Sequence, residues 1–170
     1  GVKIPKEVPA SSVEWKDVIA EAEYVTAKEN LTIPLGKDEF DVNVIGDVHK
    51  LVHLLVCGST GSGKSMFLHT VITSLLARNS PERLRFILDD AKRVEFSLYD
   101  NVPHLLTPVL SDSRKTVLAL KWLGKEMERR YDVLETTGVR DIKAYHENVV
   151  APALVAAEKS SSDEPLPEAM

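Results

Sequence analysis

The eight residues from Gly58 to Ser65, GSTGSGKS, constrain the fold of this chain more than any other stretch. They fit the pattern G-x-x-x-x-G-K-[ST], which is typical of a phosphate-binding loop. An apolar run, residues 52–57, precedes the loop, and a helical pattern begins near Lys64. A strand, a glycine-rich loop and a helix in this order are the expected setting of such a loop. An ordinary turn between a strand and a helix is the alternative, which we discount because the full pattern is rare by chance.

The loop can bind phosphate because of its glycines and the helix that follows. Without Cβ atoms the backbone can curl until successive N–H groups converge on one small volume. The N–H groups of the first helical turn and the positive end of the helix dipole point into the same volume. Lys64 can reach the β- and γ-phosphates and the Ser65 hydroxyl can coordinate Mg²⁺, so both are candidate catalytic residues. A nucleoside triphosphate with Mg²⁺ is the implied ligand, held by Gly58, Ser59, Thr60, Gly61, Ser62, Gly63, Lys64 and Ser65.

Composition and charge limit the classes of protein to which the chain can belong. With 170 residues and 44% hydrophobic content, the chain is long enough for one domain with a sizeable core. Its net charge of -5 provides no overall positive field to hold a polyanion. The single cysteine, Cys57, excludes an internal disulfide and fits a reducing cytosol. No run approaches the ~20 apolar residues of a membrane helix, and residues 1–5 lack the features of a signal peptide, so we expect a soluble fragment.

The residues before the loop predict an arm, a helix and a hairpin. Residues 1–10 hold two prolines and are expected to form an extended arm, followed by Ser11-Ser12 as an N-cap. The helix formers after this cap predict a helix that ends near residue 27. Apolar and polar residues alternate over 31–36 and 41–45, which indicates a hairpin-like pair with Pro34 at an edge.

The residues after the loop predict the core of an α/β sheet. A helix is expected from Lys64 to about Arg78, and an apolar run over 84–90 follows it. Strand, loop, helix and strand at this spacing form a right-handed βαβ unit with parallel strands. The expected fold class is therefore an α/β P-loop NTPase with a mainly parallel sheet flanked by helices.

The C-terminal half is expected to be mostly helical. A short strand is predicted near residues 108–110, and a long helix from Asp112 to Gly138. Its apolar side chains recur on one face at Val117, Leu120, Leu123, Met127, Tyr131 and Leu134. A further helix is expected over 141–157, kinked or interrupted at Pro152. We divide the chain into residues 1–30, an arm and helix; residues 31–158, the partial ATPase core; and residues 159–170, a tail of disordered composition.

Several separate segments, in the right order over about residues 30–150, resemble the motor domain of the FtsK/SpoIIIE DNA translocases. Leu35-Gly36-Lys37-Asp38 resembles the segment that the family has ahead of its P-loop, and His53-Leu54-Leu55-Val56 is similar to its "PHLLVAG" strand. Residues 87–96 are similar to "IDPKxxEL", and residues 99–109 continue the match. Residues 126–131 are similar to "EMERRY". The resemblance implies a RecA-like core.

The chain departs from the family's pattern at three positions. Val52 replaces a proline, Asp89 an apolar strand residue and Ala91 the proline of "DPK". A charged carboxylate on a buried strand end costs several kcal/mol without a partner, so Asp89 must find one, face solvent or stay protonated. The family's Walker B strand, with its Asp-Glu pair, is expected beyond Met170, so we expect this chain to be truncated before it.

The resemblance implies the first half of a motor that uses ATP and Mg²⁺ to move double-stranded DNA in chromosome segregation and cell division. It further implies a homo-hexameric ring in the cytoplasm, with DNA-contacting loops and trans-acting residues mostly outside this chain. The intact protein of this family is often anchored in the cell membrane by a segment absent here. A different P-loop class, such as a small-molecule kinase, and a non-catalytic assembly fragment are the alternatives.

Two acidic residues, Asp89 and Asp90, follow the apolar run and resemble a Walker B end by themselves. The family match instead places Asp90 at the aspartate of "IDPK". We favour a role in capping the following turn, with Mg²⁺ binding by Asp90 as the alternative. For Lys92 and Glu95 we favour an ion pair or a subunit contact.

Other polar and aromatic residues are expected to be structural. His53, His69 and His104 lack the spacing of metal ligands, so packing is favoured. Arg129-Arg130 is expected on a solvated helix face, with DNA or a neighbouring subunit as the alternative. Trp122 is expected in packing rather than in base stacking.

Overall fold

A computed structural model describes residues 13–160 and Pro167. The chain divides into two compact units, Gly1–Ser80 and Pro81–Met170, which are described separately. The arm over residues 1–10, Ser11-Ser12 and nearly all of the tail lie outside the described residues. The first described helix has Glu14 at its N-cap, so the prediction of a Ser11-Ser12 cap was wrong. The division of the chain at residues 30 and 158 stays a prediction.

The first unit begins with two short helices in place of the one predicted. Helix α1 (Trp15–Ala20) and helix α2 (Ala22–Thr26) are separated by Glu21, whose ψ of 143° is extended. Val18 and Tyr24 are both buried, at 3% and 5% exposed. Six residues apart, these side chains would lie about 120° apart around a straight helix, and the break allows both to reach the core.

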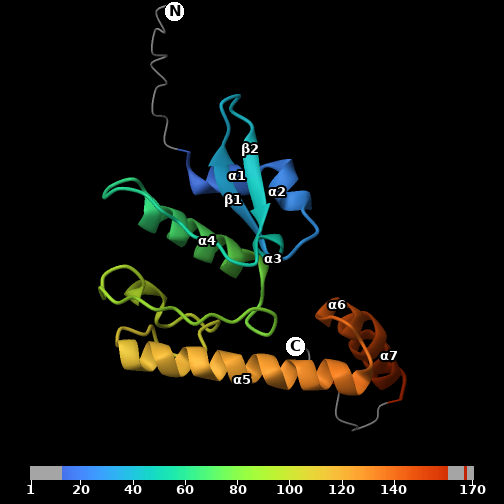
Figure 1. Ribbon diagram of the computed structural model, residues 1–170. Helices are drawn as coiled ribbons and strands as arrows, with labels where there is room; N and C mark the ends of the chain where they lie inside the picture. Colours follow the sequence, from blue (N-terminus) through green and yellow to red (C-terminus); the bar gives the residue numbers. More distant parts are fainter. Residues whose placement is uncertain (1–12, 161–166, 168–170) are drawn as a thin grey trace, which may run out of the picture. The chain divides into compact units, whose positions relative to one another are not determined.

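A β-hairpin follows, as the alternating pattern predicts. Strand β1 (Thr32–Lys37) pairs antiparallel with strand β2 (Asn43–Asp47), and an irregularity of register lies between Pro34 and Gly36 (Figure 1). Both strands are edges, where a proline without an N–H group is tolerated. Asp41 in the turn has φ 64°, a conformation that aspartate adopts more readily than most residues.

The apolar run before the loop does not form the predicted strand. Helix α3 (Val48–Leu51) is followed by Val52 at its C-cap, which has φ 55°. The proline that the family has at this position could not adopt this angle, because its ring fixes φ at about -65°. Residues 54–59 then have no regular structure, and Leu55 is 86% exposed. A strand needs a neighbour to accept and donate its hydrogen bonds, and within residues 13–160 no strand pairs with this run.

Helix α4 (Lys64–Arg78) has the predicted bounds and is held by the N-terminal helices. Trp15 Nε1 donates to Ser74 Oγ over 2.7 Å, and Ile72 and Leu75 are buried. At the C-terminal end, Arg78 donates to the carbonyl oxygens of Tyr24, Ala27 and Glu29 over 2.9, 2.7 and 3.2 Å. The guanidinium lies 4.8 Å from the centre of the Tyr24 ring. These contacts fix the helix that carries the phosphate-binding loop.

We expect Arg78→Met to lower the free energy of unfolding of the first unit by about 2 kcal/mol, because three carbonyls lose a charged donor. Amide hydrogen exchange along α4 measures this change directly, since protection in the helix reports its opening. Arg83→Met is the control, because Arg83 is exposed and forms no hydrogen bond or ion pair among the described residues. Equal protection in Arg78→Met and the parent would show that the Arg78 bonds do not hold α4.

In the second unit, two segments pair in parallel. Residues 86–90 and 105–110 are joined by the bridges Phe86–Leu105 and Asp89–Leu110. The N–H group of Leu110 donates to Leu88 O over 2.8 Å, and that of Asp90 to Leu110 O over 2.7 Å. In place of the strand expected near residues 108–110, the segment forms an isolated parallel bridge with the 84–90 run at Leu110 and Asp89. Pairing of that run with the segment before the loop stays a prediction.

The helices of the second unit follow the predicted capping residues. Helix α5 (Ser113–Thr137) begins after Asp112, whose carboxylate accepts the Arg114 N–H, and ends at Gly138 with φ 70°. The described residues of this unit leave its apolar face partly exposed: Val117, Leu120 and Met127 are 49%, 62% and 55% exposed. A short 3₁₀ helix, η1 (Ser97–Tyr99), lies before the second segment of the parallel pair.

The last helical stretch is interrupted as Pro152 requires. Helix α6 (Ile142–Tyr145) is followed by a π-helical turn, η2 (His146–Val150), and by helix α7 (Ala151–Ser160). The N–H group of Ala151 donates to His146 O, five residues back. A wider turn directly before a proline accommodates its missing N–H group and the bulk of its ring.

Candidate functional site

The phosphate-binding loop owes its shape to two glycines with left-handed backbone. Gly61 and Gly63 have φ 80° and 91°, which other residues rarely adopt, and both have open space where a Cβ would stand. Gly58 leaves room for the Ser62 side chain, which would have to shift if a Cβ stood there. The Ser62 N–H donates to Ser59 O over 3.2 Å and closes the turn.

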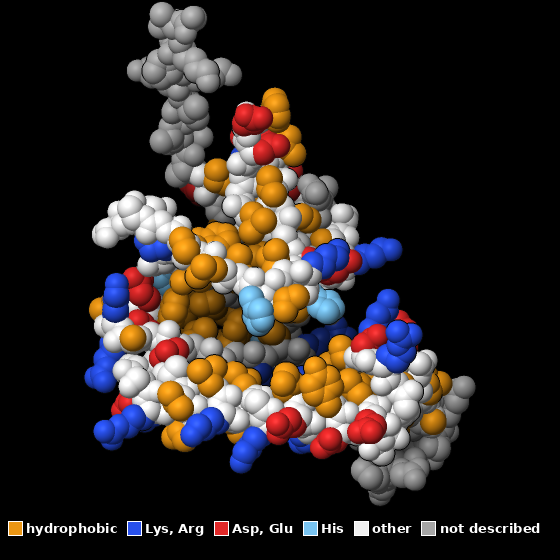
Figure 2. Space-filling model, viewed as in Figure 1, with side chains coloured by type: hydrophobic (Ala, Val, Ile, Leu, Met, Phe, Trp, Pro, Cys, Tyr) orange, Lys and Arg blue, Asp and Glu red, His pale blue; other side chains and the backbone are white. Residues whose placement is uncertain are grey.

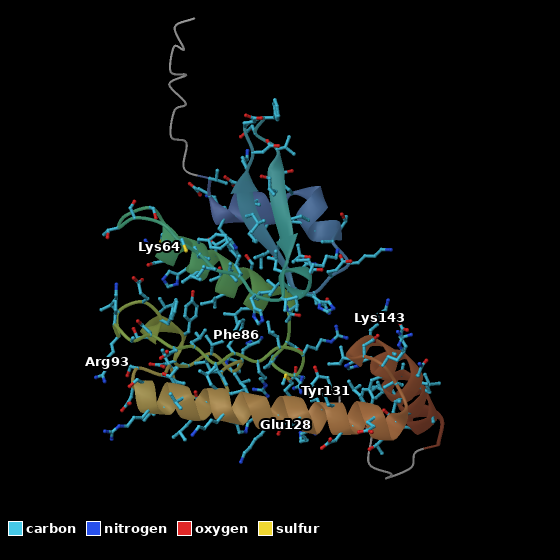
Figure 3. All side chains as sticks on the ribbon, viewed as in Figure 1. Lys64, Phe86, Arg93, Glu128, Tyr131 and Lys143 are labelled. Atoms are coloured by element: carbon cyan, nitrogen blue, oxygen red, sulfur yellow. The ribbon has the colours of Figure 1, made fainter. Side chains whose placement is uncertain are left out.

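Lys64 is the first residue of α4 and its side chain folds over the loop (Figure 3). Its Nζ donates to Gly58 O over 2.8 Å and to Ser59 O over 2.6 Å. The ammonium group is thus already held beside the backbone that is expected to surround the phosphates. The arrangement leaves its third N–H proton for an incoming oxygen.

The loop and helix fit a triphosphate with Mg²⁺. Residues 58–63 are exposed and Lys64 and Ser65 are half-buried, so the concave side of the loop is open to a ligand. The Phe67 N–H donates to Gly63 O, which starts the helical pattern and leaves the preceding first-turn N–H groups without a carbonyl of their own helix. Backbone donors, one ammonium and a serine hydroxyl are the donor set that phosphate and Mg²⁺ require.

Asp90 lies in the second unit and serves as the acceptor for the turn that follows it. One carboxylate oxygen accepts the N–H groups of Lys92 and Arg93, and the other accepts those of Val94, Glu95 and Phe96, over 2.7–3.2 Å. The side chain is 6% exposed. These bonds, that from Glu95 first, hold the pKa of Asp90 below its ordinary value, while desolvation opposes them. Turn capping is therefore the observed role, and Mg²⁺ binding by Asp90 stays a prediction.

The neighbours of Asp90 have no catalytic arrangement of their own. Asp89 is exposed, so of the three expected ways to place its carboxylate at the end of the apolar run, contact with solvent is the one observed. Arg93 has φ 58°, and its side chain points outward from the turn (Figure 3). The ion pair or subunit contact expected for Lys92 and Glu95 stays a prediction.

The histidines belong to no candidate metal site, because no group of three or more metal-ligating side chains occurs within residues 13–160 and Pro167. His104 is buried beside Phe86, with ring centres 6.4 Å apart, as packing predicts. Trp122 is 47% exposed. Arg129 and Arg130, whose side chains are 41% and 44% exposed on the helix, both donate to Glu126.

The sequence reasoning did not find the residues that hold α4 in place. Arg78 reaches three carbonyls, and Asn79 Nδ2 donates to Asn30 O over 2.9 Å. A basic residue in the last turn of a helix, followed by asparagine, is the signal that could have indicated a C-terminal anchor.

Comparison with known proteins identifies close relatives over most of the chain. The model of the FtsK/SpoIIIE family matches residues 14–160. The chain is 46% identical over 149 residues to DNA translocase FtsK of Haemophilus influenzae, covering 88% of this chain and 28% of that protein. It is 42% identical over 149 residues to DNA translocase FtsK of Agrobacterium fabrum, covering 88% and 17%. The chain thus spans less than a third of either relative.

Two solved structures share the fold. The pCW3 conjugation coupling protein TcpA, in a monomer form with ATPγS, matches with a TM-score of 0.60 and 26% identity, over 75% of this chain and 34% of that one. The cytoplasmic domain of the type VII secretion ATPase EccC from Thermomonospora curvata matches with a TM-score of 0.60 and 23% identity, over 92% and 18%. These neighbours confirm the α/β P-loop fold class. No helix within residues 13–160 has the length and apolarity needed to cross a membrane.

Proposed function

Because this chain belongs to the FtsK/SpoIIIE family over residues 14–160, we propose that it is the ATP-binding part of an ATP-driven motor that moves double-stranded DNA. The observation that carries the proposal is the open loop of residues 58–65 at the start of α4, with Lys64 Nζ bound to its carbonyls. The relatives named as DNA translocases and the ATPγS in a structural neighbour support the same assignment.

Each residue of the loop has a defined task in this proposal. The N–H groups of residues 58–63 and of the first turn of α4 bind the phosphate oxygens. Lys64 moves from the carbonyls of Gly58 and Ser59 to the β- and γ-phosphates, where it offsets charge in the transition state. Ser65 would hold Mg²⁺, which supplies further charge neutralisation when bound. The water-activating acid is expected in the part of the relatives that this chain does not span.

We further propose partners for the intact protein. We propose double-stranded DNA as the substrate that the intact protein moves, with contacts mostly outside this chain, and a homo-hexameric ring as its assembly. The net charge of -5 supports this division, because this part alone has no overall attraction for a polyanion. We place this part of the protein in the cytoplasm, where ATP is available and thiols such as Cys57 stay reduced.

The intact protein tests the proposal. ATP hydrolysis should rise when linear duplex DNA is added, and Lys64→Ala should abolish the stimulated rate. A small-molecule kinase would instead transfer the phosphoryl group to an acceptor and ignore DNA. Hydrolysis by intact protein that is indifferent to duplex DNA, or phosphoryl transfer to a small acceptor, would overturn the motor assignment.

A further inference from the structure

The tip of the β1–β2 hairpin presents an aromatic side chain within an acidic turn. Phe40 is 76% exposed, and three carboxylates, Asp38, Glu39 and Asp41, surround it with Lys37 as the only cation, for a net charge of -2. Figure 2 shows carboxylates and hydrophobic side chains together at this tip. Burial of this ring against a partner would contribute free energy that is lost while it lies in water.

Hydrogen bonds and an ion pair order the backbone of the turn. The Asp38 carboxylate accepts the N–H groups of Phe40 and Val42 over 2.8 and 3.0 Å, and the Asp38 N–H donates to Val42 O over 2.9 Å. Lys37 Nζ lies 2.9 Å from Asp41 Oδ1. Because the backbone is already ordered, docking of Phe40 would cost little further conformational entropy.

The second unit contains a groove whose net charge is opposite to that of the hairpin tip. It has a volume of about 800 Å³. Its charged lining residues, called the rim below, are Arg83, Arg85, Arg129 and Arg130 with Glu82 and Glu126, for a net charge of +2. Arg129 and Arg130 each donate to Glu126 over 2.8 Å. Hydrogen bonds from Arg129 first, then from Arg130, lower the pKa of Glu126 to about 2, so this carboxylate stays charged and keeps both guanidiniums in place.

Among the apolar lining residues of the groove, called the floor below, Leu106, Trp122 and Met127 are 44%, 47% and 55% exposed. An aromatic ring can lie on such a floor while acidic neighbours meet the arginines at the rim, as in protein interfaces with an apolar centre and a polar edge.

We propose that the hairpin tip of one copy of the chain docks in this groove of a second copy. Phe40 lies on the apolar floor, and the acidic turn faces the arginines of the rim. A second copy is the occupant because the same chain supplies both surfaces, with charges of -2 and +2 that match in size. A contact between two different surfaces of one chain is head-to-tail, and a series of such contacts closes into a ring when the rotation allows.

The inference deepens the proposed assembly, on which it rests, by assigning the surfaces that meet in it. One inserted ring and its flanking charges form a small interface, so the association of isolated chains should be weak and best measured at high concentration. Its failure would leave nucleotide binding at residues 58–65 untouched, because the hairpin tip and the groove share no residue with the loop.

Sedimentation equilibrium of the 170-residue chain, without nucleotide or DNA, tests the contact. The parent chain should associate with rising concentration, and Phe40→Ala should weaken this association by at least about tenfold. Glu39→Arg and Arg83→Glu should each weaken it similarly, because like charges then meet across the interface. Glu128→Arg is the control, since Glu128 lies on α5 outside the groove lining and should leave association unchanged (Figure 3).

Mixing the two charge variants excludes misfolding as the cause. In a mixture, the arginine introduced at the hairpin tip of one variant meets the glutamate introduced at the groove rim of the other. The unaltered tip and groove of the two variants meet in the opposite direction, so association should return to near the parent level. The double variant should also associate.

Two results would overturn the proposed contact. The first is a parent chain that stays monomeric up to about 1 mM, where even weak specific contacts are populated. The second is a set of charge variants that associate like the parent, or a mixture of them that associates no better than its parts.

Discussion

Lys64→Ala should bind MgATP about ten- to a hundredfold more weakly than the parent chain. The substitution removes an ammonium that lies 2.8 Å from Gly58 O and 2.6 Å from Ser59 O, beside the loop backbone. A hydrogen bond from a charged donor contributes roughly 1.5–3 kcal/mol, which corresponds to that range of affinity. Isothermal titration calorimetry of the 170-residue chain measures it.

The matched control for Lys64 is Lys28→Ala. Lys28 is exposed, lies in the same unit and forms no hydrogen bond or ion pair among the described residues. Its loss changes the net charge by the same amount and should leave affinity for MgATP within about twofold. If Lys64→Ala bound MgATP as tightly as Lys28→Ala, the ammonium would not contact the phosphates.

Asp90→Asn should lower the midpoint temperature of unfolding of the second unit by about 5 °C or more. The amide keeps the size of the carboxylate but replaces one oxygen with an N–H donor, which then faces backbone N–H groups that need an acceptor. Either the pair from Lys92 and Arg93 or the three from Val94, Glu95 and Phe96 lose theirs. Calorimetric unfolding measures the change.

The same substitution should remove part of the acid sensitivity of the second unit. The pKa of Asp90 is lowered from 3.8 in the folded chain, so its stabilising effect is fully present above pH 3.8 and is lost as the pH falls through the lower folded value. Asp89→Asn is the control, because Asp89 faces solvent and should unfold like the parent. Equal midpoints for the two variants would show that the turn does not depend on Asp90.

Helices α4 and α5 could be predicted from the sequence because local chemistry specifies their ends, whereas the break between α1 and α2 could not. Gly63 precedes α4, and α5 begins after Asp112 and ends at Gly138. Pro152 similarly indicated an interruption, because proline lacks an N–H group whatever surrounds it. The GSTGSGKS loop was recognisable for a similar reason, since Gly61 and Gly63 adopt φ values that other residues rarely adopt.

The strand pairing and the hydrogen bonds that hold α4 were harder to predict from the sequence, because they depend on residues far apart in the chain. The 52–57 run has the composition of a strand, but composition provides no hydrogen-bonding neighbour. Asp90 could be read as a metal ligand or as a turn cap, and only the five N–H groups around it distinguish these roles. Arg78 donates to carbonyls about 50 residues earlier, and the local periodicity of the sequence contains no signal for such a contact.

Backbone amide shifts on addition of MgATP test most directly whether the loop binds the triphosphate. The N–H groups of residues 58–65, at the head of α4, should show the largest changes in a ¹H–¹⁵N spectrum, and Lys64→Ala should reduce them at equal ligand concentration. Saturating MgATP that leaves these amides unchanged, or that shifts only residues of the second unit, would contradict the assignment of the loop as the nucleotide site.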